Sequence, residues 1–199
     1  EKVAAEVAIG ASIAGARAMS CCKHVGLNVM ADPVFTVSYI GVNGGLVFCV
    51  ADDPGMHSSQ NEQDSRHYAK ASKTAMLEPA DSQECKDFTR QAFALSEEFD
   101  APFFLRLTTR ISHSQSLVAL GQREELPLRP YEKNIAKNVM MPANAIRRHV
   151  AVEERAERLI EYAETTSLNR IEDNGAEIGV VADGDLAHRH GRFLRAVLE

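Results

Sequence analysis

The 199-residue sequence contains no tryptophan, and aromatic residues make up only 6% of it. Its predicted core therefore consists mainly of Ala, Val, Leu, Ile and Phe. No basic run offsets the formal net charge of -6, which argues against a nucleic-acid or anionic-membrane surface. No apolar stretch approaches the roughly 20 residues that a membrane span needs, and no secretory signal peptide is visible.

The sequence also lacks any C-x-x-C spacing among its four cysteines, Cys21, Cys22, Cys49 and Cys85. A zinc ribbon or an iron–sulfur cluster held by this chain is therefore not expected, and we predict no metal site. Scattered cysteines without an export signal indicate reduced thiols and a cytoplasmic location.

The length suits one domain, or one domain plus part of another. The first residue is Glu1, within a helical pattern, and the last residues, "FLRAVLE", directly follow an apparent helix start. These two features predict a piece of a longer polypeptide.

Helical and strand patterns alternate along the first part of the chain. Helices are predicted over residues 1–18, 26–42, 62–73 and 82–98, and strands over 19–24, 44–52, 75–79 and 101–109. Such alternation predicts an α/β fold with three αβα layers and a mostly parallel sheet. Pro33 should bend or interrupt the second helix, and Asp81 or Ser82 should cap the fourth, with Glu84 completing a capping box.

Two glycines in the first helix, Gly10 and Gly15, predict that another backbone or a ligand comes close. Residues 111–142 contain three prolines and few periodic apolar positions, which indicates an extended linker. An amphipathic Arg- and Glu-rich helix follows over 143–166, as a solvated face or a brace between domains. The segment 176–184, "AEIGVVADG", is typical of the first strand of a second α/β domain.

We therefore predict a first domain over residues 1–112, a linker over 113–142, a bracing helix over 143–174 and the start of a second domain over 175–199. In open parallel sheets, ligands bind beyond the carboxyl ends of the strands. The polar segment "DDPGMHSSQNEQDSRHYA", residues 52–69, leaves such an end, and so does the turn after "MSCCKH". Both segments should line one crevice at this rim.

Four stretches carry a family resemblance: "EKVAAEVAIGASIAGARAM", "KHVGLNVMADPVFTVSYIGVNGGLVF", "ADDPGMHSSQNEQDSRHYA" and "KNIAKNVMMPANAIRRHVAVEER". They resemble the alpha subunits of the indolepyruvate ferredoxin oxidoreductases, thiamine-diphosphate enzymes among the 2-oxoacid:ferredoxin oxidoreductases. The likeness covers about residues 1 to 182 and implies the domain that binds the cofactor's pyrimidine ring.

The resemblance implies oxidative decarboxylation of arylpyruvates to acyl-CoA, with electrons passed to ferredoxin. The full enzyme would use thiamine diphosphate with Mg2+, CoA and [4Fe-4S] clusters. It would contain a beta subunit and the remaining part of the alpha subunit. The diphosphate-binding motif and the cluster ligands are absent from this chain, which alone should be inactive. Two alternatives remain: a non-catalytic scaffold or assembly fragment, and a related enzyme with another 2-oxo acid specificity.

The resemblance places the catalytic acid, which favours the reactive imino tautomer of the pyrimidine, at Glu1. Such an acid would be buried, which would raise its pKa and keep its proton available near neutral pH. The alternative is a frayed, solvated terminal residue, and Glu6 is the fallback candidate.

The rim residues complete the predicted site. Lys23, His24 and Asn28 are predicted to bind the cofactor, or else to form an ordinary turn with Gly26. Arg66 would meet an anionic substrate, or would only pair with Asp64 or Glu62. The other predicted substrate-binding residues are His57, Ser58, Ser59, Gln60, Asn61 and Gln63. Like Glu62 among them, they have donors or acceptors that suit a 2-oxo acid. Alternatively, they satisfy backbone groups of the loop and cap the next helix.

Overall fold

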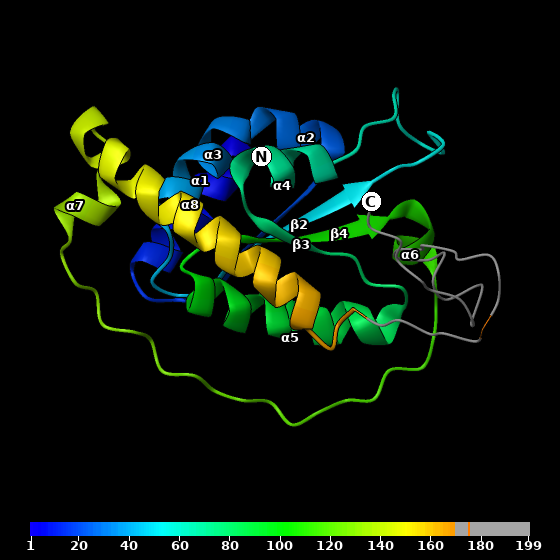
Figure 1. Ribbon diagram of the computed structural model, residues 1–199. Helices are drawn as coiled ribbons and strands as arrows, with labels where there is room; N and C mark the ends of the chain where they lie inside the picture. The colour runs from blue at the N-terminus through cyan, green and yellow to red at the C-terminus, as the bar shows by residue number, and fades with distance from the viewer. Residues whose placement is uncertain (170–174, 176–199) are drawn as a thin grey trace.

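The computed structural model describes residues 1–169 and Gly175. Its sheet is entirely parallel, and its strands lie in the order β1-β2-β4-β3 (Figure 1). The strands are β1 (Ala18–Lys23), β2 (Leu46–Asp52), β3 (Ala75–Leu77) and β4 (Phe103–Thr108). The predicted α/β class is thus confirmed. All strands point the same way, so their carboxyl ends form one rim.

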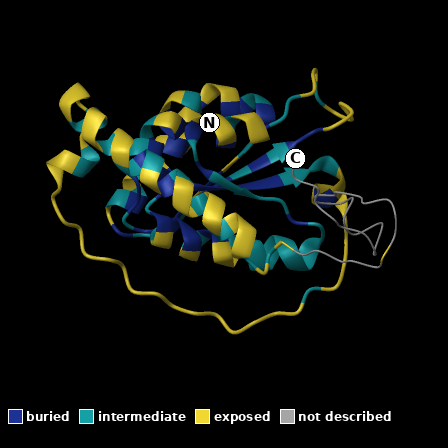
Figure 2. Ribbon diagram, in the orientation of Figure 1, coloured by how far each residue is buried: buried dark blue, intermediate teal, exposed yellow. Residues whose placement is uncertain are grey.

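Helices cover both faces of the sheet, and alternating strand side chains supply the two cores (Figure 2). Phe48 and Phe104 point into a core with the first four helices, whereas Val47 and Phe103 point toward the fifth. These helices are α1 (Lys2–Ile13), α2 (His24–Val29), α3 (Ala31–Ile40), α4 (Arg66–Ser72) and α5 (Ser82–Phe99). No helix in the described part of the chain could cross a membrane.

The first helix ends earlier than predicted, at Ile13, because Gly15 adopts a positive φ of 98°. The carbonyl oxygen of Arg129 lies 1.9 Å from where a Cβ on Gly15 would be, and the Arg129 N–H donates to the Gly15 carbonyl at 3.0 Å. The predicted close backbone is therefore confirmed at Gly15. At Gly10 no described backbone comes close, because a Cβ there would meet nothing within 4 Å.

The helix predicted over 26–42 is two helices, α2 and α3, which separate at Met30. Pro33 explains the break, because it has no N–H to donate to the carbonyl four residues earlier, yet it fits the first turn of a new helix. The next helix, α4, starts at Arg66 instead of residue 62. Residues 62–65 remain in the loop, where their polar groups bind other partners.

The capping prediction for α5 is confirmed. Asp81 Oδ1 accepts from the Glu84 N–H at 2.8 Å, and Glu84 Oε2 accepts from the Ala80 N–H at 2.7 Å. Asp81 thus satisfies a donor in the first turn of the helix, and Glu84 satisfies the N–H of the residue that precedes the cap. The helix then runs to Phe99 along the sheet face that α1–α4 leave open.

A short helix, α6 (Thr109–His113), precedes the predicted linker, which consists of an extended strap over residues 114–134 and a second short helix, α7 (Ile135–Asn138). Polar contacts attach the strap to α5: Lys86 Nζ donates to the Ala119 carbonyl at 2.7 Å, and Arg129 pairs with Glu97 at 2.8 Å. Its leucines do not pack, since Leu117 is 99% exposed. The strap is fastened by polar groups and contributes little to the core.

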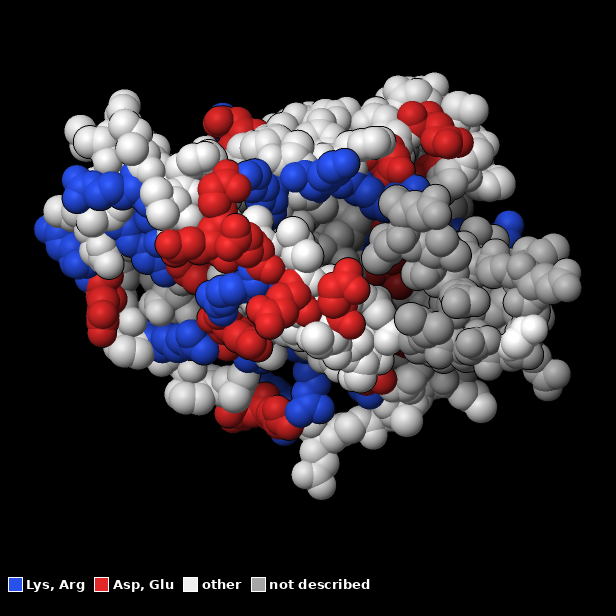
Figure 3. Space-filling view, in the orientation of Figure 1, with Lys and Arg blue, Asp and Glu red and all other residues white. Residues whose placement is uncertain are grey.

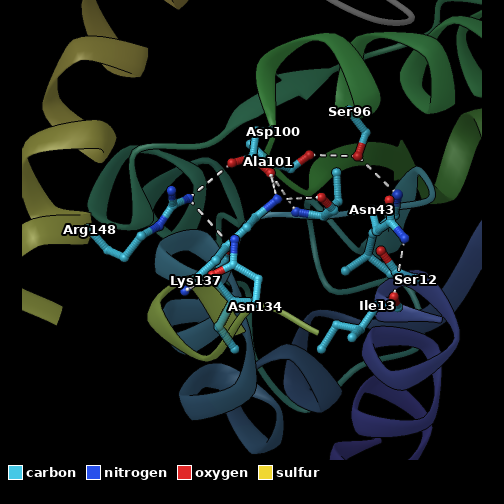
Figure 4. Close-up of polar contacts among 12 residues, drawn as sticks. Ser12, Ile13, Asn43, Ser96, Asp100, Ala101, Asn134, Lys137 and Arg148 are labelled. Carbon is cyan, nitrogen blue, oxygen red and sulfur yellow. Dashed lines mark hydrogen bonds and ion pairs between the residues drawn. The ribbon is translucent and has the colours of Figure 1, made fainter. Parts of the chain in front are cut away.

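The last described helix, α8 (Pro142–Thr165), docks on the sheet domain through Asp100. The Asp100 carboxylate accepts from Val42 N at 2.9 Å, Lys137 Nζ at 2.7 Å and Arg148 Nη2 at 3.0 Å (Figure 4). It lies directly against Gly41, where a Cβ would be 2.2 Å from Asp100 Oδ1. One carboxylate thus joins α7, α8 and the turn before β2.

Two arginines of α8 also cap the carboxyl end of α3, where carbonyls lack partners within the helix. Arg148 Nε donates to the Tyr39 carbonyl at 2.7 Å, and Arg155 Nη2 to the Ser38 carbonyl at 2.6 Å. Burial lowers the pKa of Arg155 to about 10.

Acidic and basic side chains alternate on the outer face of the molecule around α8 (Figure 3). The strand predicted over 176–184 lies outside the described residues.

Candidate functional site

The site is built on a buried ionic base at the end of β2. Asp52 is fully buried and accepts from Arg106 Nε of β4 at 2.6 Å and from the Ser65 N–H at 3.0 Å. Arg106, only 6% exposed, also donates to Glu78 Oε2 at 3.0 Å. Arg106 is therefore a buried ion-pair partner that connects the base of the polar loop to the strands β2 and β4.

The neighbouring Asp53 shapes the first turn of the loop. Its carboxylate accepts from the Thr109 hydroxyl at 2.5 Å, from the Ser58 N–H at 2.8 Å and from the His57 N–H at 3.1 Å. These bonds, that of Thr109 above all, hold the pKa of Asp53 well below its usual value. Asp53 therefore satisfies backbone donors of the loop.

Asp53→Asn should loosen this turn without unfolding the domain. A neutral amide replaces a charged acceptor, so the N–H groups of His57 and Ser58 should exchange about tenfold faster. Because folding lowers the pKa of Asp53, its carboxylate stabilises the loop fully at any pH above about 4, the pKa of an aspartate in an unfolded chain. The difference in amide exchange rate between the variant and the wild type should become smaller as the pH falls through the pKa that Asp53 has in the folded protein.

Amide hydrogen exchange between neutral and acid pH measures this effect. Asp32→Asn is the matched control, because Asp32 is exposed on α3, away from the loop. Equal exchange rates at residues 57 and 58 in all three proteins would contradict the role given to Asp53.

The two predicted rim segments do meet, as expected from the parallel sheet. Lys23 Nζ donates to Ser59 Oγ at 3.3 Å, and Asn28 Nδ2 donates to Gln63 Oε1 at 2.9 Å. Tyr68 of α4 also donates to Asn28 Oδ1. The polar loop, the start of α2 and α4 therefore form one connected polar surface.

The side chains of the loop divide into two groups. Gln63 Nε2 donates to Asn61 Oδ1 at 2.8 Å, and Glu62 accepts from the Gly55 N–H at 2.7 Å, so these three residues also stabilise the loop itself. His57, Ser58 and Gln60 expose their side chains beyond the turn. The exposed group is the part of the loop best placed to meet a ligand.

Arg66 lies at the base of the loop and pairs with Asp64, at 2.7 Å between Nη2 and Oδ2. This hydrogen-bonded pair lowers the pKa of Asp64 to about 2. Glu78 lies 3.9 Å from Arg66 Nε. The pairing with Asp64 that the sequence left open is therefore present, while Arg66 keeps 49% of its side chain exposed.

His24 is the unusual polar residue of the site. It is 1% exposed, and neither ring nitrogen has a hydrogen-bond partner. The hydroxyl of Ser20, on β1, is also buried without a partner. Leaving such groups unsatisfied costs about 1 to 3 kcal/mol each, so a buried orphan beside a rim indicates a group that meets a ligand or water.

Glu1 precedes α1 at the same end of the molecule and makes no side-chain cap bond to that helix. Contrary to the expectation of a buried acid, the residue is exposed in this chain. Its side chain nevertheless lies against α2, because Glu1 Oε1 is 3.0 Å from where a Cβ on Gly26 would be. The fallback candidate, Glu6, is also exposed and lies 3.9 Å from Lys2 Nζ.

The sequence did not indicate two parts of this site. The Asp52–Arg106 pair was missed because the two residues are 54 positions apart and only the strand register joins β2 to β4. The contact of Gly26 with Glu1 was missed because it depends on how α2 packs. Among the described residues, no group of three or more His, Cys, Asp or Glu could hold a metal ion.

Comparison with known proteins identifies relatives of most of the chain. The family model described as "Pyruvate flavodoxin/ferredoxin oxidoreductase, thiamine diP-bdg" matches residues 1–178. The indolepyruvate oxidoreductase subunit IorA of Archaeoglobus fulgidus is 44% identical over 186 residues, and that of Pyrococcus horikoshii is 45% identical over 194. Each match covers 92% of this chain and 30% of the relative, so the chain spans under a third of these proteins.

A solved structure shares the fold. It is a 2-oxoglutarate:ferredoxin oxidoreductase from Magnetococcus marinus with 2-oxoglutarate, coenzyme A and succinyl-CoA bound. The match has a TM-score of 0.60 and 15% identity, and it covers 88% of this chain and 37% of that one. At this identity the likeness concerns the arrangement of helices and strands.

Proposed function

Since the chain belongs to the pyruvate flavodoxin/ferredoxin oxidoreductase family of thiamine diphosphate-binding domains, we propose that it is the pyrimidine-binding part of an indolepyruvate ferredoxin oxidoreductase. The whole enzyme would decarboxylate arylpyruvates oxidatively to acyl-CoA and pass electrons to ferredoxin. The observation that carries the proposal is the rim around α2: Asn28 binds Gln63 of the polar loop, Glu1 lies against Gly26, and His24 is buried with no partner for its ring nitrogens.

The residues at this rim fit the pyrimidine ring of thiamine diphosphate in their chemistry. Glu1 supplies a carboxyl group that is not used as a helix cap, and His24 supplies two buried ring nitrogens without partners. Lys23 and Asn28 add donors on the same segment. A heteroaromatic ring with several nitrogen atoms can satisfy such a mixed set.

When bound, thiamine diphosphate supplies a carbon nucleophile and an electron sink for the 2-oxo acid. In this proposal Glu1 holds a proton at a ring nitrogen and thereby favours the reactive tautomer. The exposure of Glu1 in this chain does not conflict with that role, because docking of a further domain over α1 would remove water from the carboxyl group.

The loop would bind the substrate. His57, Ser58 and Gln60 expose side chains that can donate to a 2-oxo acid carboxylate, and Arg66 keeps half of its side chain accessible. Ser59, Asn61 and Gln63 would orient the exposed side chains, as their contacts within the rim suggest. The proposed substrate-binding residues are thus His57, Ser58, Ser59, Gln60, Asn61, Gln63 and Arg66.

The remaining cofactors and partners belong to the rest of the proposed enzyme. Mg2+ would bind with the diphosphate on another domain, and [4Fe-4S] clusters, CoA, ferredoxin and a beta subunit would interact elsewhere. We also propose a cytoplasmic location, which the four free cysteines support. The division into a domain over 1–112, a linker over 113–142, a brace over 143–174 and a second domain from 175 is part of this proposal, supported by the strap and the docked α8.

Calorimetric titration with thiamine diphosphate and Mg2+ tests the proposal. The isolated chain should bind weakly, because the diphosphate anchor lies elsewhere, and the assembled enzyme should bind tightly. An assembled enzyme without affinity for the cofactor would favour a scaffold or assembly role. If the cofactor binds, kcat/KM for indolepyruvate against pyruvate and 2-oxoglutarate decides the substrate class.

A further inference from the structure

A glycine of α2 lies directly beneath the side chain of Glu1. A Cβ built on Gly26 would be 2.6 Å from Glu1 Cγ and 3.0 Å from Glu1 Oε1, and 3.0 Å from Cys22 Cβ. Real Cβ atoms essentially never approach another atom to less than 3.0 Å. Any side chain at position 26 would therefore displace Glu1 from its present place.

The backbone does not explain why this residue is glycine. Gly26 is within a helix and is not among the residues with positive φ, and its carbonyl accepts an ordinary helical bond from Met30 N at 3.1 Å. Alanine is the better residue at such a helical position. The contacts with Glu1, which include the shortest, and with Cys22 distinguish Gly26 from a position that would favour alanine.

The helix that carries Gly26 is fixed to the polar loop. Asn28, two residues further on, binds Gln63 at 2.9 Å and accepts from Tyr68. Lys23, at the other end, donates to Ser59 at 3.3 Å. Gly26, and with it the surface on which the Glu1 side chain lies, is thus held in a defined place relative to the proposed substrate-binding loop.

We propose that Gly26 is a positioning residue for Glu1: it leaves the space in which the Glu1 carboxyl lies at the rim. This inference rests on the proposed function, because it gives Glu1 the role of the acid that faces the pyrimidine ring. Gly26 itself contributes no polar group and acts only through the place that it leaves for Glu1.

The test compares Gly26→Ala with Gly10→Ala in the assembled enzyme. Gly10 is the matched control, since it is also helical and a Cβ there would meet nothing within 4 Å. The readout is the tautomer of bound thiamine diphosphate, followed by near-ultraviolet circular dichroism against pH. Gly26→Ala should lower the ratio of imino to amino tautomer roughly 10- to 100-fold, as expected for a misplaced group. Gly10→Ala should leave it unchanged.

A double variant shows whether Gly26 acts through Glu1. Glu1→Gln combined with Gly26→Ala should lower the tautomer ratio no further than Glu1→Gln alone, whereas additive losses would overturn the inference. The inference would be overturned, and the proposed function left intact, if Glu1→Gln lowered the tautomer ratio while Gly26→Ala left it as unchanged as Gly10→Ala does. Loss of cofactor affinity in the wild-type enzyme, or no effect of Glu1→Gln, would instead reject the proposed function, and the inference with it.

A stability measurement covers the case in which Gly26→Ala fails to fold. Glu1→Ala removes Cγ and the carboxyl, so Glu1→Ala combined with Gly26→Ala should have a Tm no lower than Glu1→Ala alone. A lower Tm in the double variant would mean that Cys22 or the backbone requires the glycine. That result would overturn the role of Gly26 toward Glu1.

Discussion

Replacing Glu1 by Gln in the assembled enzyme is expected to slow hydrogen exchange at C2 of bound thiamine diphosphate by about two to four orders of magnitude. Glutamine keeps the size of the side chain but cannot share a proton with the ring nitrogen. Cofactor affinity should change far less, because in the proposed enzyme the diphosphate would be anchored on another domain. Quenched-flow exchange followed by proton NMR measures the rate.

Glu6→Gln is the matched control for this experiment. Glu6 is on α1, the helix that Glu1 precedes; it is exposed and lies beside Lys2. Its exchange rate should equal that of the wild type. A normal rate in Glu1→Gln would remove Glu1 from the mechanism, and a slow rate only in Glu6→Gln would transfer the role to the fallback residue.

Replacing Arg106 by Leu should destabilise the domain by about 3 to 5 kcal/mol. The substitution leaves the fully buried Asp52 without its charged partner, 2.6 Å away in the wild type, and Ser65 alone cannot compensate a buried charge. Chemical denaturation with urea, at constant m-value, measures the loss. The loop should also become accessible to limited proteolysis, because Asp52 holds Ser65 at the loop's end.

Two further variants decide whether the ion pair causes this loss. Arg123→Leu removes an exposed partner of Glu125, with 85% of the arginine side chain accessible, and should change stability by less than about 0.5 kcal/mol. Adding Asp52→Asn to Arg106→Leu removes the uncompensated charge and should recover part of the stability. No recovery would indicate that packing of the Arg106 side chain dominates.

Local patterns in the sequence were sufficient to predict most of the fold. The continuous apolar run of β2 predicted a buried strand, and the Asp81–Glu84 spacing predicted the start of α5, because each signal depends only on neighbouring residues. The relation between the two rim segments was also predictable, since parallel strands place their carboxyl ends together. Lys23–Ser59 and Asn28–Gln63 contacts confirm that expectation.

Features that depend on packing between distant segments were not predictable in the same way. Gly10 and Gly15 have the same local context, yet only Gly15 faces another backbone, which comes from residue 129. Arg148 and Arg155 look like surface charges in an Arg- and Glu-rich helix, but both turn inward to cap α3. The exposure of Glu1 matches the solvated alternative and not the buried acid that the resemblance implies, because burial depends on what covers α1.

The peptide connection through the strap, residues 114–134, contributes little to holding α8 against the sheet domain. The strap is exposed and held by polar contacts, whereas α8 is attached independently through Asp100, Arg148 and Arg155. A protease that cuts the strap would produce two pieces that remain associated at ordinary protein concentrations. The molecule should therefore tolerate nicking, and its two halves should reassemble when they are produced as separate polypeptides.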